Sequence, residues 1–317
     1  MNIVLLEPLL VPQETINTLA APLKAAGHRF KAYDTPTKDP GQLIQRAQGA
    51  DIIIIDNTPL PAQVIQALPQ LKFVDVAFTG VDQVALDACR ARGILLSNCA
   101  GYSDTSVAEL VCGLTVDLLR QIPACQQATR SGGTSQGLLG TEIAGKTVGI
   151  LGTGHIGTRV AQLFLAFGAR VLGYARHQNP HCVALGVEYP GLKDLLTHSD
   201  ILTVHLPLTP ETRGFLDAEK IAAMKPGSYL VNCARGPIVD TPALAQALTS
   251  GHLAGAAIDV FEQEPPLPST NPLLKAPHTV LTPHVGYFTA EAMVRRATIA
   301  FENVAAYCQG APQNLVI

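Results

Sequence analysis

Arginine, glutamate and histidine side chains follow three apolar segments in the second half of the chain. Arg235 comes after "SYLVNC", Glu264 after "GAAIDVF" and His284 after "HTVLT". Short apolar runs bounded by glycine, proline and other turn residues predict buried β-strands. If these strands are parallel neighbours, their carboxyl ends lie at one edge of a sheet, where open α/β sheets bind ligands. The sequence therefore favours one site that contains all three side chains.

These side chains suit proton transfer at a carbonyl group that lies beside a carboxylate. The planar guanidinium of Arg235 can bind carboxylate and carbonyl oxygens through two hydrogen bonds at once. Histidine, with an ordinary pKa of about 6.5, exchanges protons near neutral pH, and this is the role expected for His284. A carboxylate hydrogen-bonded to a histidine favours its charged form and fixes its orientation, and this is the role expected for Glu264.

Each of these residues also has a purely structural interpretation. Arg235 and Glu264 could be solvated loop residues, and His284 a core or turn histidine. Asp259, in "AAIDVF", could be a helix-cap or turn acid. Polar clusters at the ends of several successive apolar segments are nevertheless hard to ascribe to chance, because acid–base groups gather at functional sites. The functional interpretation is favoured for the set as a whole.

A glycine-rich motif earlier in the chain predicts a dinucleotide-binding site. In "GKTVGILGTGHIGTRVAQLFLAFGARVLGY", an apolar strand at residues 147–151 precedes Gly152, Gly154 and Gly157, and a helix and a second strand follow. In such a βαβ unit the first glycine allows a tight turn, the second lets a pyrophosphate approach the backbone, and the third lets the helix pack on the strand. The helix N-terminus, with His155 and Ile156, then faces the anion.

The end of the second strand of this unit indicates which dinucleotide is preferred. NAD-specific sites carry an Asp or Glu about 20 residues after the glycines, which binds the ribose 2′-hydroxyl. Here that position is Ala175, followed by Arg176, and the next acid is Glu188. Without the carboxylate a 2′-phosphate is not repelled, and Arg176 can bind it. We expect NADP to be preferred over NAD, whereas an Arg176 that is only solvated or stacks on adenine would allow both.

The remaining pattern predicts an α/β protein with two doubly wound parallel-sheet domains. Residues 1–98 alternate strand-like and helix-like segments in a βαβαβ series, which implies a parallel sheet with helices on both faces. A long helical pattern from about Ser103 to Arg130, followed by the breaker-rich "SGGTSQGLLG", leads to the second α/β series. We interpret this stretch as a domain connection.

Composition points to a small-molecule partner rather than to nucleic acid or a membrane. The 317 residues are 47% apolar and 15% charged with a formal net charge of −3, so no basic surface for nucleic acid is indicated. The start "MNIVLLEP" has no basic leader, and no apolar run approaches the roughly 20 residues of a membrane span, which favours a cytoplasmic protein. The seven cysteines lack zinc-binding spacing, so no metal is expected. Cys233 is expected to be a buried strand-end residue rather than a nucleophile.

Several motifs, in this order and spacing, resemble those of the D-isomer-specific 2-hydroxyacid dehydrogenases. They are the glycine-rich motif, "HLPLTPETRG", "VNCARGPIVD", "AAIDVFEQEP" and "TPHVG", and with "NCAGYSDTSVAEL" the resemblance covers nearly the whole chain. It implies hydride transfer between NAD(P)H and a small 2-oxo acid such as glyoxylate or hydroxypyruvate, giving a D-2-hydroxy acid. It also implies that Arg235, Glu264 and His284 are the catalytic arginine, glutamate and histidine.

The resemblance further implies the residues that bind substrate and cofactor. The loop "AFTGVD" is similar to the family loop whose backbone amides bind the substrate carboxylate, here at Phe78, Thr79 and Gly80. Asp259 is similar to a residue that contacts the nicotinamide carboxamide or supports the arginine. The other cofactor contacts implied by the motifs are His205, Leu206, Pro207, Thr212, Cys233, Ala234 and Gly286.

Domain organisation and assembly follow from the same resemblance. Residues 1–98 and 286–317 are expected to form a flavodoxin-like substrate domain, residues 99–285 a Rossmann dinucleotide-binding domain, and the substrate is expected between them. The long helix and the segment after it resemble the family's dimer contact, so a homodimer is expected. Tyr287 departs from the family pattern, because many relatives carry a small residue there.

Two other functions stay open at the level of the sequence. A phosphite dehydrogenase-like enzyme would carry the same three catalytic residues. A non-catalytic, dinucleotide-sensing protein, similar to the co-repressors built on this fold, would keep the cofactor site and bind partners instead. Added tails or peptide-docking segments would mark such a sensor, and this compact chain is not expected to have them.

Overall fold

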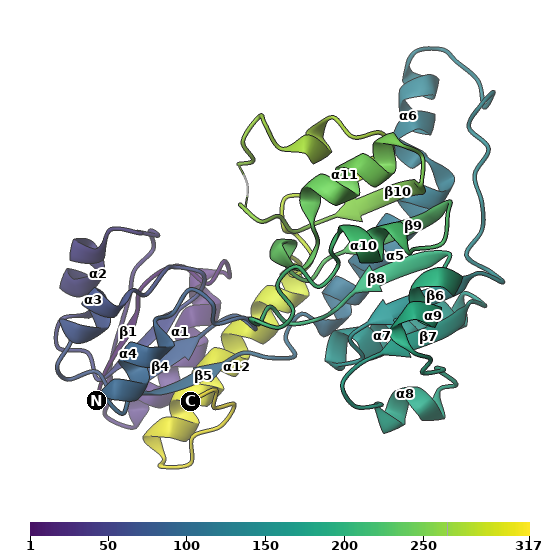
Figure 1. The fold of residues 1–317 in the computed structure, drawn as a ribbon. Coiled ribbons are helices and arrows are strands. Elements are labelled where there is room, and N and C mark those ends of the chain that lie inside the picture. The colour runs from purple at the N-terminus through teal and green to yellow at the C-terminus, as the bar shows by residue number, and fades with distance from the viewer. Residues whose placement is uncertain (265) are drawn as a thin grey trace. The chain divides into compact units, whose positions relative to one another are not determined.

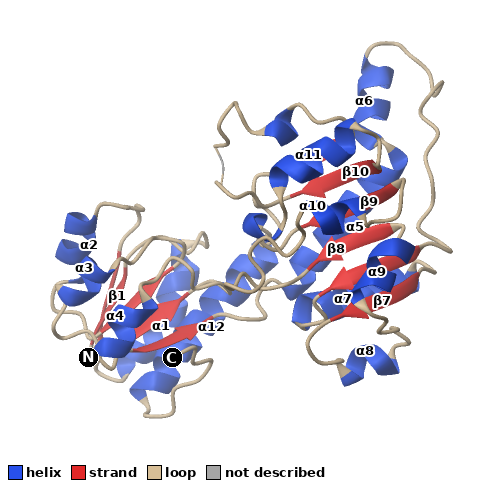
Figure 2. Ribbon diagram, viewed as in Figure 1, coloured by secondary structure: helices blue, strands red, loops and turns tan. Residues whose placement is uncertain are grey.

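The computed structural model describes residues 1–264 and 266–317, and the chain divides into two compact units (Figure 1). Unit 1 contains Met1–Ser103 and Phe288–Ile317, and unit 2 contains Asp104–Tyr287. Each unit is built on a parallel β-sheet with helices packed on its faces (Figure 2). The predicted α/β class with two parallel sheets is therefore confirmed.

The sheet of unit 1 has five strands in the order β2-β1-β3-β4-β5, all of them parallel. The strands are β1 (Asn2–Leu5), β2 (Arg29–Ala32), β3 (Ile52–Ile55), β4 (Phe73–Val76) and β5 (Leu95–Asn98). The helices are α1 (Gln13–Ala25), α2 (Pro40–Ala47), α3 (Ala62–Gln66), α4 (Leu86–Ala91) and α12 (Ala290–Cys308). The central strand β3 consists of four buried isoleucines, because both faces of such a sheet are covered.

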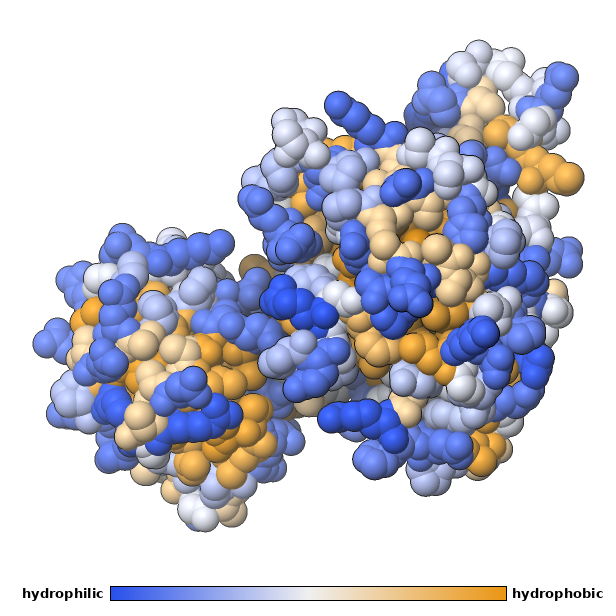
Figure 3. Space-filling model, in the orientation of Figure 1, coloured by the Kyte–Doolittle hydropathy of each residue, from blue (hydrophilic) through white to orange (hydrophobic). Residues whose placement is uncertain are grey.

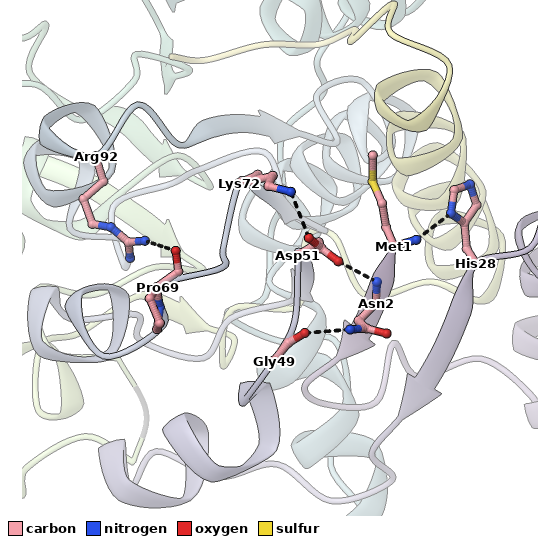
Figure 4. A network of polar contacts seen from close by, with 8 residues as sticks. All are labelled: Met1, Asn2, His28, Gly49, Asp51, Pro69, Lys72 and Arg92. Carbon is pink, nitrogen blue, oxygen red and sulfur yellow. Dashed lines mark hydrogen bonds and ion pairs between the residues drawn. The ribbon is translucent and has the colours of Figure 1, made fainter.

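Polar contacts fix the beginning of β1 in unit 1 (Figure 4). The Asn2 amide donates to Asp51 Oδ2 over 2.8 Å, and Asn2 Nδ2 donates to the Gly49 carbonyl over 2.9 Å. Lys72 Nζ lies 3.1 Å from Asp51 Oδ1. Burial opposes ionisation of Asp51, but the Asn2 amide and Lys72 hold its pKa below the ordinary value. Because Asp51 and Lys72 directly precede β3 and β4, these contacts join the amino ends of three strands.

Helix α12 belongs to unit 1 and is held there by buried polar contacts. Arg296 is fully buried, with Nη1 2.6 Å from Asp56 Oδ1 and Nη2 2.9 Å from the Leu9 carbonyl. Asn303 Nδ2 donates to Asp75 Oδ1 over 2.8 Å. Burial raises the pKa of Asp56 to about 7, against the opposing charge of Arg296. The helix thereby joins the loops after β1 and β3 to the interior of β4.

The sheet of unit 2 has six parallel strands in the order β11-β10-β9-β8-β6-β7. The strands are β6 (Thr147–Leu151), β7 (Arg170–Tyr174), β8 (Ile201–Val204), β9 (Ser228–Asn232), β10 (Leu253–Ile258) and β11 (Thr279–Leu281). The helices are α5 (Asp104–Arg120), α6 (Ile122–Arg130), α7 (His155–Ala166), α8 (Pro180–Ala184), α9 (Leu192–His198), α10 (Ala218–Ala222) and α11 (Thr241–Thr249), with the 3₁₀ turns η1 (Gly236–Ile238) and η2 (Pro272–Leu274). The strands that precede Arg235, Asp259 and His284 are thus parallel neighbours, as predicted.

The long helix predicted from Ser103 to Arg130 is two helices in the structure, and that prediction was wrong in this detail. α5 ends at Arg120, Gln121 takes a left-handed backbone conformation with φ of 50°, and α6 begins with Pro123 in its first turn. Proline has no backbone amide to donate, so the helical hydrogen bonding of α5 cannot continue through it. α6 contains no buried residue, and Leu139 in the segment after it is 92% exposed.

Hydrophobic side chains are visible on this projecting part of unit 2 at the upper right of Figure 3. Elsewhere on the visible face of each unit, hydrophilic and hydrophobic residues lie side by side.

Candidate active site

Arg235 is placed by a close approach between the loops that follow β9 and β10. A Cβ atom on Gly236 would lie only 1.9 Å from the Phe261 carbonyl carbon, so only glycine allows this contact. Asn232, at the end of β9, accepts from the Ala234 amide over 3.0 Å and donates to the Arg235 carbonyl over 3.1 Å. The loop carrying Arg235 is therefore packed against the loop that leads to Glu264. Arg235 is partly buried, and its Nη1 donates to the Ala234 carbonyl over 2.8 Å.

His284 is held by Asp259, which is fully buried at the end of β10. Asp259 Oδ1 accepts from the Thr282 hydroxyl over 2.5 Å and from the Val285 amide over 2.8 Å, and Oδ2 accepts from the Gly286 amide over 2.8 Å. The His284 amide donates to the Asp259 carbonyl over 2.8 Å. The carboxylate of Asp259 thus organises the whole turn after β11, and this is a positioning role.

The side chains of His284 and Glu264 meet. His284 Nδ1 lies 3.2 Å from Glu264 Oε2, and the two side chains are 22% and 45% exposed. The Tyr287 ring packs edge-on against the imidazole, with centroids 5.4 Å apart and planes at 88°. A carboxylate placed at Nδ1 fixes the orientation of the imidazole ring. The structure therefore brings the predicted histidine and glutamate together.

The glycine-rich turn after β6 has the geometry expected of a dinucleotide site. Gly152 has φ of 98°, and a Cβ there would lie 2.6 Å from the His205 carbonyl oxygen. A Cβ on Gly157 would lie 1.9 Å from the Gly152 carbonyl oxygen, so the helix packs directly on the turn. A Cβ on Gly154 would meet no described atom within 4 Å. The open side of Gly154 at the start of α7 fits an approaching pyrophosphate.

The first turn of α7 contains the other two residues predicted near the pyrophosphate. The His155 side chain is exposed, and its Nδ1 lies 3.4 Å from Asp104 Oδ2 at the start of α5. Ile156 is partly buried and packs against the hydrophobic core of unit 2. Of these two residues, His155 presents a polar side chain beside the turn, whereas Ile156 can offer its backbone amide.

The loop after β8 lies against the glycine-rich turn and contains four predicted cofactor contacts. His205 is partly buried, and burial lowers its pKa to about 3, so its imidazole is neutral at physiological pH. Leu206 packs on the hydrophobic core of unit 2. Thr212 Oγ1 donates to the Pro207 carbonyl over 2.6 Å and accepts from the Thr209 amide over 2.7 Å. Thr212 therefore closes the loop on itself.

The loop after β7 carries the residues predicted to select the cofactor. Ala175 is partly buried and Arg176 is exposed. Glu188 pairs with Arg170 at 2.5 Å and is thereby engaged away from this loop. Hydrogen bonds from Thr209 and its own backbone, together with the charge of Arg176, lower the pKa of Glu211. Glu211, in the loop after β8, was not among the residues expected from the sequence to influence the cofactor site, and the charge of Arg176 acts on it.

The predicted substrate loop lies in unit 1, directly after β4. The Phe78 amide donates to the Val76 carbonyl over 2.7 Å, and the Phe78 carbonyl accepts from the Cys99 amide over 2.9 Å. Asn98 Nδ2 donates to the Thr79 carbonyl over 2.7 Å. The loop is thus fixed by its carbonyl groups, and Thr79 and Gly80 are its more accessible residues.

Five of the seven cysteines are buried, and Cys125 and Cys308 are partly exposed. All seven are free, and Cys233 is buried at the end of β9, where burial raises its pKa well above the ordinary value. Such a thiol is a poor nucleophile. Within residues 1–264 and 266–317, no group of three His, Cys, Asp or Glu side chains is arranged to hold a metal ion. In the same residues, no helix combines the length and apolarity needed to cross a bilayer.

Comparisons with known proteins agree on one family. A family model described as "D-isomer specific 2-hydroxyacid dehydrogenase, NAD binding domain" matches residues 112–286. The chain is 43% identical over 274 residues to a D-3-phosphoglycerate dehydrogenase of Mycobacterium bovis, covering 86% of this chain and 51% of that protein. It therefore spans about half the length of that relative. It is 37% identical over 298 residues to a glycerate dehydrogenase of Methylorubrum extorquens, covering 91% and 92% of the two chains.

Solved structures extend the similarity to both units. A glyoxylate reductase from Paecilomyes thermophila superposes with a TM-score of 0.89 at 27% identity, covering 100% of this chain and 98% of that chain. The similarity in fold thus includes unit 1 as well as the part that the family model matches.

Proposed function

The chain belongs to the D-isomer-specific 2-hydroxyacid dehydrogenase family, and we propose that it reduces small 2-oxo acids to D-2-hydroxy acids with NADPH or NADH. The observation that carries this proposal is the contact between His284 and Glu264 beside the loop of Arg235. A histidine with a carboxylate on Nδ1 can deliver a proton, and an arginine nearby can bind the acid that receives it. Glyoxylate- and hydroxypyruvate-like acids are the proposed substrates, because relatives include a glycerate dehydrogenase and a glyoxylate reductase.

Arg235 binds the substrate carboxylate and the carbonyl oxygen. Its guanidinium offers paired donors in one plane, so it orients the carbonyl group as well as attracting the anion. The backbone amides of the loop Phe78–Gly80 are proposed to bind the same carboxylate. Because the Phe78 amide already donates to Val76, the amides of Thr79 and Gly80 are the better candidates within this loop.

His284 donates the proton that the carbonyl oxygen takes up on reduction. Glu264 holds the orientation of the imidazole through Nδ1. Asp259 positions His284 by fixing the turn after β11, and Gly286 is held in the same turn. In the oxidative direction the same imidazole accepts the proton from the hydroxyl group.

The dinucleotide would lie along the carboxyl edge of the sheet in unit 2. Its pyrophosphate would meet Gly154 and the start of α7 with His155 and Ile156, and its adenosine end the loop of Ala175 and Arg176. Residues His205, Leu206, Pro207, Thr212, Cys233, Ala234 and Asp259 would line the remainder. When bound, the nicotinamide supplies the hydride. NADP is the preferred form in this proposal, because Ala175 stands where an acid would disfavour a 2′-phosphate and the exposed Arg176 beside it can bind one.

A second copy of the chain is the proposed partner. An isolated helix of about ten residues is marginal in water, yet α6 has no buried residue. Leu139, which is 92% exposed, and Ile122, which is 45% exposed, leave apolar surface on the same projecting segment. A homodimer that covers this segment explains both observations. Light scattering should give twice the chain mass, and Leu139→Glu should reduce it.

The cytoplasm is the proposed compartment. All seven cysteines are free, and thiols persist in reducing compartments.

A substrate panel tests the proposed function. Glyoxylate, hydroxypyruvate, pyruvate and bulkier 2-oxo acids are offered with NADPH and with NADH, and phosphite is offered with NADP and NAD. Reduction of the small acids supports the proposal. A folded protein that binds cofactor but turns over none of them would favour the dinucleotide-sensing alternative, and oxidation of phosphite alone would favour the phosphite dehydrogenase-like one.

A further inference from the structure

Thr153, which lies between the first two glycines of the glycine-rich turn, is tied to residues from elsewhere in unit 2. Its carbonyl accepts from Asn179 Nδ2 over 2.9 Å, and its Oγ1 accepts from the Tyr189 hydroxyl over 2.9 Å. Thr153 is only 4% exposed. The turn that would face the pyrophosphate is therefore held in place by hydrogen bonds from the side chains of Asn179 and Tyr189.

Asn179 lies at the end of the loop that carries Arg176. Its Oδ1 accepts from the His181 amide over 3.0 Å, which caps α8. The backbone amide of Asn179 donates to the Tyr189 hydroxyl over 3.2 Å. Asn179 Nδ2 also donates to Thr158 Oγ1 on α7 over 3.1 Å. Residues 175–178 are thus held between the end of β7 and a residue bonded to the glycine-rich turn.

Tyr189 fits closely into this arrangement. A Cβ on Gly173 in β7 would lie 3.1 Å from Tyr189 Cε1 and 3.0 Å from Thr153 Cγ2, so a glycine makes room for the ring. Burial raises the pKa of Tyr189, which keeps the phenol protonated and able to donate to Thr153. The hydroxyl therefore donates to the turn and accepts from Asn179 at the same time.

We propose that Asn179 and Tyr189 are positioning residues that hold the loop of residues 175–178, and with it Arg176, in register with the glycine-rich turn, and that they thereby set the affinity for the 2′-phosphate of the cofactor. The inference rests on the proposed cofactor site. Both residues lie outside the positions that the family motifs imply, and they act through the two loops that contact the dinucleotide.

The two cofactors respond differently to a loosened loop. Both NADPH and NADH place a pyrophosphate on the turn, but only NADPH places a charged group beside Arg176. An exposed arginine binds a phosphate well only when its backbone is held at a fixed distance from it, because otherwise the loop must be ordered on binding. Loss of the anchor therefore weakens NADPH binding more than NADH binding.

Three variants separate the anchor from other roles of these residues. Tyr189→Phe keeps the ring against Gly173 and removes only the hydroxyl. Asn179→Asp keeps the acceptor that caps α8 and removes the donor to Thr153 and Thr158. Arg176→Ala removes the proposed phosphate ligand itself. Tyr229→Phe, in β9, serves as the matched control for loss of a partly buried phenol.

Dissociation constants for NADPH and NADH are measured by the fluorescence of the bound cofactor, which no tryptophan obscures because the chain has none. Tyr189→Phe and Asn179→Asp should each raise the dissociation constant for NADPH about 3- to 10-fold, the range of one lost hydrogen bond, and that for NADH less than about 2-fold. Tyr229→Phe should change neither. The double variant Tyr189→Phe/Thr153→Val should weaken NADPH binding less than the sum of the two single changes. Each single change already removes the same hydrogen bond, from the Tyr189 hydroxyl to Thr153 Oγ1.

The outcomes distinguish this inference from the proposed function. If Arg176→Ala weakens NADPH binding selectively but Tyr189→Phe and Asn179→Asp do not, the anchor is disproved and the cofactor site stands. If both variants weaken the two cofactors equally or lower the melting temperature of the apoprotein, the role is only structural and the inference fails. If Arg176→Ala leaves the ratio of the dissociation constants for NADPH and NADH unchanged, the proposed phosphate contact is wrong and this inference fails with it. The proposed reduction of 2-oxo acids is tested independently, by measuring turnover.

Discussion

His284 Nδ1 lies 3.2 Å from Glu264 Oε2, while the backbone of His284 has φ of 56° in the left-handed region. A non-glycine residue in that region costs about 1–3 kcal/mol. Even a fully charged pair as accessible as this contact, with side chains 22% and 45% exposed, contributes only about 0–1 kcal/mol to stability. Stability alone therefore does not explain the conformation. Strain that is maintained at a histidine–carboxylate contact is typical of a functional site.

Replacement of the histidine tests the proton donor. His284→Ala should lower kcat for a 2-oxo acid about 10²- to 10⁴-fold, because general acid–base catalysis contributes that much. Cofactor affinity should stay close to that of the wild type, since the imidazole is not among the proposed dinucleotide contacts. Steady-state kinetics and cofactor titration measure the two effects. Wild-type turnover in His284→Ala would show that another group donates the proton.

The glutamate is tested by combining its replacement with that of the histidine. Glu264→Gln keeps the size of the side chain but removes the carboxylate that lies 3.2 Å from His284 Nδ1, so the imidazole loses the contact that orients it. kcat for the 2-oxo acid should fall, but less than in His284→Ala, and the double variant should be no slower than His284→Ala alone. Steady-state kinetics of the three variants measures these effects. A double variant clearly slower than His284→Ala would mean that Glu264 does not act through His284.

The arginine is tested by a change that keeps its charge. Arg235→Lys should mainly raise KM for the 2-oxo acid, because an ammonium group cannot make the paired, planar contacts of a guanidinium. The effect on kcat should be smaller than that of His284→Ala. Comparison of KM and kcat for the two variants decides the matter. A large fall in kcat with unchanged KM would assign Arg235 to the transition state only.

The positions of apolar runs along the sequence predicted which side chains lie at the carboxyl edge of the sheet. Parallel strands were expected, so the shared edge for Arg235, Asp259 and His284 followed from where the apolar runs end. The break at Gln121 was missed, because proline is tolerated in the first turn of a helix and the pattern around Pro123 looks continuous.

Contacts between distant parts of the chain could not be read from such patterns. Gly236 looked like an ordinary turn residue, and only the fold shows that a Cβ would strike Phe261, 25 positions later. The anchor from Asn179 to Thr153 spans 26 positions for the same reason. The electrostatic interaction of Glu211 with Arg176 also joins two loops, and the sequence motif that contains Glu211 does not indicate it.

Buried Asp56 should make the stability of the protein depend on pH. Burial raises its folded-state pKa to about 7, above the value of about 3.9 expected when unfolded. The contribution is therefore fully present below about pH 4 and is lost as the pH rises through 7, by roughly 4 kcal/mol at most. Asp56→Asn should lower stability overall, because it leaves the buried Arg296 without its carboxylate partner, and should flatten this dependence.

Urea unfolding between pH 5 and pH 8 measures the dependence on Asp56. The matched control is Asp51→Asn in the same unit. The pKa of Asp51 is lowered, so its contribution is lost only below about pH 4, and the difference between Asp51→Asn and the wild type should be constant over this range. If the free energy of unfolding of Asp56→Asn still depends on pH as steeply as that of the wild type, the dependence would come from another buried group, such as Asp75.

The cofactor preference depends on one loop and is the sharpest prediction for this chain. Ala175 stands where NAD-specific sites carry an acid, Arg176 follows it at the surface, and Glu188 is engaged with Arg170. A 2′-phosphate dianion is therefore not repelled by a carboxylate at the end of this strand, and the guanidinium of Arg176 can bind it. The negative charge of Glu211, in the loop after β8, interacts with Arg176 and reduces this preference for NADPH. We expect a higher kcat/KM with NADPH than with NADH at a saturating 2-oxo acid. The double change Ala175→Asp with Arg176→Ala should reverse the order, because it restores an acceptor for the ribose hydroxyls and removes the phosphate ligand. A wild-type protein that clearly prefers NADH would refute this assignment and leave the roles of His284, Glu264 and Arg235 unaffected.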